Sequence, residues 1–162
     1  MSKFSLDFKD FLDFAYQLEE LGGTDALKKA TENALNLSKE EANKNIDLAL
    51  RNSPYSFEAG QKYSTGGVRE SFEEVSKRPV EWDGDVCRAY IGVDTAKEPE
   101  ILFAMYGTPQ HNVADSNLRN AIQVKGKYRK KIDEIQLNEF NKVLDEVLRQ
   151  WLIFLQILIN KQ

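Results

Sequence analysis

Apolar residues recur at helical spacing in three stretches of the chain. The first stretch predicts a helix over residues 9–21, which the glycine pair 22–23 ends. The second predicts a helix over residues 24–52, which Pro54 stops because proline disfavours helical geometry in the residue before it. The third and most regular stretch predicts a long C-terminal helix over residues 132–160. Helices are therefore expected at both ends of the chain.

The strands are expected between these helices, within residues 68–106. Residues 86–93 alternate in the manner of a strand, and residues 71–75 and 100–106 supply two further predicted strands. Short turns join consecutive strands, which favours antiparallel pairing. The predicted fold class is therefore α+β, with a small antiparallel sheet packed against two N-terminal helices and one long C-terminal helix in a single domain spanning residues 1–162.

Two other segments show neither period. Residues 54–67 predict a loop that is long for a compact domain, and long loops of this kind often carry function. Residues 110–131 are expected to be irregular or to contain one short helix. The loop over residues 54–67 and the apolar end of the last helix are the expected contact surfaces between copies of the chain.

Composition supports a folded, non-membrane protein. The 162 residues suffice for one domain, and 41% hydrophobic with 30% charged residues is typical of globular chains. The most apolar run, residues 151–159, is much shorter than the about 20 residues that cross a bilayer. We expect it to be buried against the protein or against a neighbouring subunit. Residues 1–10 lack the apolar core of a secretory signal.

The candidate chemistry is sparse. His111 is the only histidine, and Asp115 lies near it in sequence, but no nucleophile accompanies them in a known catalytic arrangement. Cys87 is the only cysteine and is expected to be a small core residue. One cysteine and one histidine do not make a zinc cage. We therefore expect no catalytic residue, no metal and no cofactor.

Two short patterns resemble binding loops but lack essential parts. Asp83 and Asp85 flank Gly84, without the further oxygen ligands of a calcium loop, so a turn is expected there. Residues 64–67 resemble a fragment of a phosphate loop, without the preceding strand or the Gly-Lys-Ser/Thr ending. Neither pattern predicts an ion or nucleotide site.

Positive charge is concentrated before the last predicted helix. Residues 125–131 hold five basic side chains, while the rest of the chain has 17 basic and 26 acidic residues. This segment is either a solvated loop or a docking patch for an acidic partner surface or a phosphate backbone. The candidate interaction residues are these five and two aromatic residues of the last helix: Lys125, Lys127, Arg129, Lys130, Lys131, Trp151 and Phe154.

The middle of the chain contains two sequence motifs whose order is informative about its family. The first spans residues 65–72, and the second spans residues 103–108 and is followed by residues 118–121. This order resembles the minor tail-component, tail-completion or neck family of long non-contractile-tailed phages, the "gene product ten-like" family. The positions that carry the resemblance are Thr65, Gly66, Val68, Arg69, Ser71, Phe103, Tyr106, Gly107 and Thr108.

The chain also departs from the family pattern. Ser64 stands where the family has aspartate, Val68 where it has leucine, and Met105 where a glutamate is frequent. Residues 55–63 separate the helix-ending proline from the first motif, which usually follows it almost at once. These differences fall on the loop and on its contacts rather than on the order of elements. The motifs themselves predict structure: a glycine pair that ends a loop and begins a strand, with Arg69 fixing that junction.

The resemblance implies a structural virion protein rather than an enzyme. Such a protein joins the head to the tail or completes the tail. By resemblance, its copies form a ring, expected to be six-fold, that contacts other neck and tail proteins. DNA passes through the ring without specific binding, which suits a net charge of −4 because an acidic wall does not hold phosphates. The chain would be made in the host cytoplasm and reside in the neck or tail of the virion.

One alternative belongs to a different functional class. The acidic body and apolar last helix also suit a small regulatory or immunity-type binding module that acts on one cellular protein. An enzyme is the least supported reading, because no set of nucleophile, base and oxyanion donors is visible in the sequence.

Overall fold

The computed structural model describes residues 24–55, 66–109 and 113–159. The helix predicted over residues 9–21 lies outside this part, as do Thr65, His111 and most of the loop predicted over residues 54–67. The elements in chain order are α2 Thr24–Asn52, α3 Gly66–Lys77, β1 Glu81–Asp83, β2 Val86–Arg88, α4 Glu100–Tyr106, α5 Ser116–Ile122 and α6 Lys127–Ile159.

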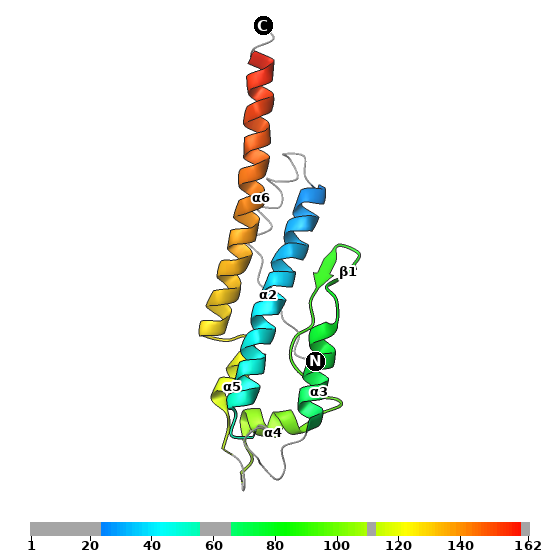
Figure 1. Cartoon of the computed structure of the whole chain (residues 1–162), viewed down its shortest axis with the longest axis vertical. Coiled ribbons are helices and arrows are strands. Elements are labelled where there is room, and N and C mark those ends of the chain that lie inside the picture. Colours follow the sequence, from blue (N-terminus) through cyan, green and yellow to red (C-terminus); the bar gives the residue numbers. More distant parts are fainter. Residues whose placement is uncertain (1–23, 56–65, 110–112, 160–162) are drawn as a thin grey trace.

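The two longest helices, α2 and α6, pack side by side and antiparallel (Figure 1). Helix α4 lies across the end of α2, and α3 and the two strands stand beside α2 on the side opposite α6 (Figure 1). Helix α6 continues well past the beginning of α2, so its last turns project from the body (Figure 1). The molecule is therefore elongated, with one helix end standing clear of the other described elements.

The main core gathers where α2 ends. Ile46 of α2 is fully buried there, and α3, α4 and α5 each add residues to the same cluster, whose members are Ile46, Ala49, Leu50, Phe72, Ile101, Met105, Leu118, Ala121 and Ile122. Two smaller clusters join α2 to α6. Ala30 and Ala34 pack with Phe140, and Ala42 packs with Ile132. Small alanine side chains let the two helix axes approach closely.

Residues 71–75 are helical, and the predicted strand there was wrong. They belong to α3, which begins at Gly66, so the glycine pair of the first motif opens a helix rather than a strand. Val68, Phe72 and Val75 are spaced by four and three residues, which places them on one helix face. Phe72 and Val75 are both buried, which fits the spacing of a helix and not the alternation of a strand.

Residues 100–106 were also predicted as a strand and instead form α4. Pro99 precedes the helix, where its fixed φ angle suits a helix start. Ile101 and Met105 lie four residues apart and are both buried, whereas Leu102 and Phe103 are exposed. A run of seven mostly apolar residues fits a strand or a helix equally well until its burial is known.

The sheet is an antiparallel hairpin of two short strands. Trp82 of β1 pairs with Cys87 of β2, and Gly84 adopts a φ of 62° in the turn between the strands, which confirms the turn predicted at Asp83 and Gly84. The strand predicted over residues 86–93 is shorter than expected and ends at Arg88. Together with the flanking helices, this small antiparallel sheet confirms the α+β fold class.

Helix α2 has the predicted bounds, and α6 begins five residues before its predicted start. The basic segment is therefore not a loop that precedes a helix. Val124 and Gly126 have positive φ angles of 49° and 59° and form the turn after α5. Lys127 is then the first residue of α6. The short helix expected within residues 110–131 is α5.

Candidate interaction surfaces

The first motif fastens α3 to α2 through Arg69. Its guanidinium Nη2 lies 3.0 Å from Oδ1 of Asp47, and its Nε lies 3.8 Å from the carboxylate of Glu73, one turn further along α3. Arg51 binds the other oxygen of Asp47 at 2.9 Å. The sequence placed Arg69 at a junction between a loop and a strand; the segment is instead a helix, and Arg69 binds carboxylates of two helices.

Ser71 is the buried polar residue of the same motif. It is 4% exposed, and its hydroxyl oxygen accepts a hydrogen bond of 3.0 Å from the backbone N–H of Asp94. This bond ties α3 to the segment that leads from β2 to α4. A buried N–H without an acceptor is costly, so the serine has a structural reason to occupy this position.

The beginning of α3 is not a phosphate site. A Cβ atom at Gly67 would lie 2.5 to 2.8 Å from the carboxylate atoms of Glu98, so this acidic side chain lies directly against the glycine backbone. A negative side chain there interacts favourably with the positive end of the helix dipole, and it repels a phosphate. The space at Gly67 is occupied by the Glu98 carboxylate rather than left open for a nucleotide.

The second motif divides into a buried and an exposed half on α4. Ala104 packs against the main core, and so does Val68 of the first motif, so the structure brings the two motifs to one cluster. Phe103 and Tyr106 are about half exposed. Gly107 ends α4 with a φ of 76°, a conformation that favours glycine, and its N–H donates to the carbonyl of Phe103. Thr108 follows directly.

The aromatic surface of α4 is held in place by α5 and its end. Gln123 hydrogen-bonds the hydroxyl of Tyr106. The guanidinium of Arg119 lies 5.8 Å from the centre of the same ring, which fits a cation–π contact. Tyr106 is therefore a fixed, half-exposed aromatic residue, which suits a contact surface.

Asp115, one of the residues considered for chemistry, has a structural role, and Cys87, expected in the core, lies outside the core clusters. The Asp115 carboxylate caps α5 by accepting the backbone N–H of Leu118 at 2.9 Å. Cys87 is half-buried on β2, where burial, and then the negative charge of Glu32, raise the pKa of its thiol. A raised thiol pKa lowers the thiolate fraction and hence reactivity. No group of three His, Cys, Asp or Glu side chains suited to a metal occurs among the described residues.

The basic segment is the first turn of α6 and the residue pair before it. Lys125, Lys130 and Lys131 are exposed and make no ion pair with any described residue. Arg129 binds Asp133 at 2.6 Å, and the ammonium of Lys127 lies 4.9 Å from the Tyr128 ring centre. Positive charge at the positive end of a helix dipole costs stability, which is consistent with a contact role.

Apolar side chains line the projecting half of α6. Leu148, Leu152 and Ile153 are 45%, 67% and 56% exposed. The side chains of Trp151 and Phe154 are not among those described. Burial of residues 151–159 against the rest of the chain was one expectation, and it is wrong for Leu152 and Ile153. Burial against a neighbouring subunit stays a prediction.

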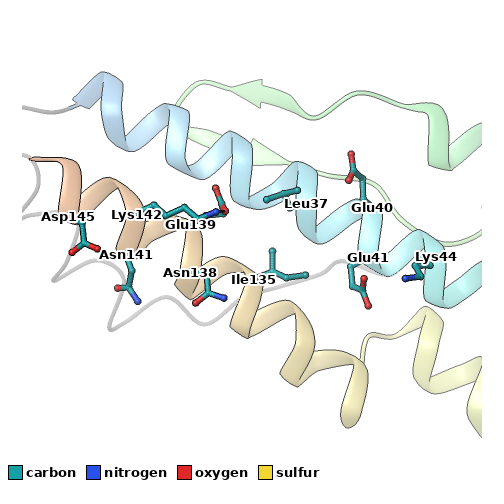
Figure 2. A pocket seen from close by; sticks show the side chains of 10 residues that line it. All are labelled: Leu37, Glu40, Glu41, Lys44, Ile135, Asn138, Glu139, Asn141, Lys142 and Asp145. Atoms are coloured by element: carbon teal, nitrogen blue, oxygen red, sulfur yellow. Dashed lines mark hydrogen bonds and ion pairs between the residues drawn. The ribbon is translucent and has the colours of Figure 1, made fainter.

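An open groove of about 560 Å³ runs between α2 and α6. Figure 2 shows that its lining side chains come from both helices, from Leu37 to Lys44 on α2 and from Ile135 to Asp145 on α6. Four carboxylates, two ammonium groups and two amides line it, with only two aliphatic residues. This groove cannot be read from the sequence, because only the pairing of two helices that are distant along the chain creates it.

Among the described helices, none is long and apolar enough to cross a bilayer. Comparison of the chain with protein-family models, curated proteins and solved structures finds no match.

Proposed function

We propose that this chain is a structural virion protein that joins the head to the tail, or completes the tail, of a long-tailed phage. Copies assemble as a ring, with six-fold symmetry as the expected arrangement, and DNA passes through it. The observation that carries the proposal is the projecting end of α6 with its exposed apolar side chains, because a monomer gains nothing from leaving Leu148, Leu152 and Ile153 in water. An assembling subunit buries them on contact.

The two motifs support the same proposal. Both contribute to the core at the end of α2, and the second motif leaves Phe103 and Tyr106 exposed. The resemblance to the phage family rests on these segments. A rigid scaffold that presents aromatic side chains is what a joining protein needs, and this arrangement requires no substrate chemistry.

The charge distribution is also consistent with this role. The net charge of −4 disfavours strong binding to the phosphate backbone along the whole surface. Local positive charge at the start of α6 supplies a contact for an acidic protein partner. The proposal therefore has DNA sliding past the ring, while neighbouring neck and tail proteins dock on it.

The test is deletion of the gene from the phage genome that encodes the chain. We expect filled heads and separate tails in lysates, seen by electron microscopy, and recovery of joined particles when the wild-type chain is supplied in trans. Joined, infectious particles without the chain would overturn the proposal. A single host protein captured in stoichiometric amount, with no virion component, would instead favour the small regulatory or immunity-type module.

A further inference from the structure

One exposed face of α6 carries opposite charges at equal distances before and after Asn138, at four and at seven residues. Lys131 lies seven positions before Asn138 and Asp145 lies seven positions after it, while Glu134 and Lys142 lie four positions before and after. Steps of four and seven residues return to the same side of a helix, so these five residues share a face. All five are exposed.

This face adjoins the open groove beside α2 through Asn138, Lys142 and Asp145, but it does not include the α6 residues that are buried against α2. Ile132 and Phe140 are the buried α6 residues of the clusters shared with α2. Figure 2 shows Asn138 and Asp145 pointing away from α2, whereas Lys142 extends toward Glu139 on the side that faces the groove. The face is therefore accessible to a second molecule without disturbing the described core.

We infer that two copies of this chain pair through this face, with their α6 helices antiparallel and Asn138 at the two-fold axis. In that arrangement Lys131 of each copy faces Asp145 of the other, and Glu134 faces Lys142. Each ionic contact occurs twice, as symmetry requires. A parallel arrangement would place like charges opposite each other, so the pattern selects both the partner and its direction.

Three of the four charged groups are available for this contact, and the fourth would have to exchange its partner. Lys131, Glu134 and Asp145 make no ion pair with any described residue, and Lys142 pairs only with Glu139, three residues before it on the same helix. Asn138 at the axis can donate a hydrogen bond to Asn138 of the other copy and accept one from it, because an amide has both a donor and an acceptor. The second copy is therefore the occupant that satisfies the whole face.

One pair of residues opposes the contact. Lys127 and Arg149 lie eleven positions before and after Asn138, so they face each other as like charges at the ends of the pairing. Exposed ion pairs are individually weak. The pairing is therefore expected to be reversible and salt-sensitive. Replacing Arg149 by glutamate should strengthen it.

The direct experiment is sedimentation velocity of the full chain at rising protein concentration. We expect dimers at about 0.01 M salt and monomers at about 1 M salt, because the Debye length falls from about 30 Å to about 3 Å. A chain that stays monomeric at about 0.01 M salt, at every concentration reached, would overturn the inference. A dimer whose stability is unchanged in about 1 M salt would overturn it equally.

A charge exchange tests the residues. The variant Lys131→Glu with Lys142→Glu has an all-acidic face, and the variant Glu134→Lys with Asp145→Lys has an all-basic face. Each variant alone should be monomeric, and an equimolar mixture should form a heterodimer, because every contact is then attractive. Restoration by mixing cannot come from misfolding. If either variant alone pairs as the wild type does, the assignment of the face is wrong.

Two controls sharpen the result. Lys28→Glu with Lys29→Glu changes the net charge as much as the all-acidic variant but at exposed residues of α2, and it should pair normally. Single-cysteine chains carrying Lys131→Cys or Asp145→Cys, on a Cys87→Ser background, should cross-link to each other and not to themselves. Cross-links only between identical positions would contradict the antiparallel register. The inference does not rest on the proposed function, and a monomeric result would leave the particle test above untouched.

Discussion

Ser71 and Arg69 show how single residues of the first motif hold α3 in place. Arg69 was predicted from the sequence to fix the junction of a loop and a strand, because a guanidinium can make forked hydrogen bonds to a carboxylate or to carbonyls. Its partner Asp47 could not be predicted, because it lies on α2, 22 residues away in sequence. The partner of Ser71, the backbone N–H of Asp94, is equally distant and depends on the path of an irregular segment.

Replacing Ser71 by alanine should lower the free energy of unfolding by about 1–3 kcal/mol, because the N–H of Asp94 loses its acceptor inside the protein. Ser76→Ala is the matched control, since the Ser76 hydroxyl is exposed and donates to the carbonyl of Glu73. Chemical denaturation in guanidinium chloride measures both. Equal losses for the two variants would show that the Ser71 bond has no special weight.

Lys39 makes the free energy of unfolding depend on pH in the alkaline range. It is 7% exposed, and its ammonium donates to the carbonyl of Arg78. Burial, and then the positive charge of Arg78, lower the pKa of Lys39 below 10.5. In the interval between the folded-state pKa and 10.5 the unfolded chain binds more protons, so this residue adds stability as pH rises.

The measurement for Lys39 is the unfolding free energy of the wild type minus that of Lys39→Met, followed with pH. This difference should increase as the pH rises toward about 10.5. Lys28→Met, at an exposed position, corrects for the loss of one charge. A difference that stays level or decreases over this interval would contradict the assignment.

At the scale of elements, the long helices were predictable, whereas the short helices α3 and α4 were not. Helix α2 has a sustained apolar stripe and ends just before Pro54, so both its period and its end are visible in the sequence. In α3 and α4 the apolar runs are short. Contacts with α2 and α5 determine which of their side chains are buried. Burial in the folded structure therefore favours helices in two segments where the local pattern predicted strands.

The packing of α2 on α6 should depend on Phe140. This side chain is buried between Ala30 and Ala34, so Phe140→Ala should cost about 3–5 kcal/mol through lost burial and the cavity left behind. Leu137→Ala on the same helix is the control, because Leu137 is 62% exposed. Guanidinium chloride denaturation compares the two. A similar cost for both would mean that α6 is not held to α2 by this contact.

At the scale of the whole molecule, shape and surface matter more than any single group. The sequence showed that residues 151–159 are apolar, but it did not show that α6 projects beyond α2. Projection follows from the lengths of the two helices and from where they cross, which only the fold determines. The groove between α2 and α6 has the same origin, so surfaces shared by two elements were beyond sequence reasoning.

The double variant Leu148→Gln with Leu152→Gln should keep its folded stability and lose its function. Both side chains are exposed, so their replacement removes little burial within the described chain. If assembly buries them, the variant should fail to restore joined particles to the deletion phage, while its thermal unfolding stays within a few degrees of the wild type. Lys28→Gln, elsewhere on the surface, should restore joining fully.

The central claim is that the chain is a built part of a phage particle, and mass spectrometry of purified virions tests it most directly. Joined particles should contain this polypeptide in a fixed, low copy number relative to the major tail protein. Tails or heads purified from the deletion phage should lack it and stay separate. Joined, infectious virions that contain none of the chain would contradict the account.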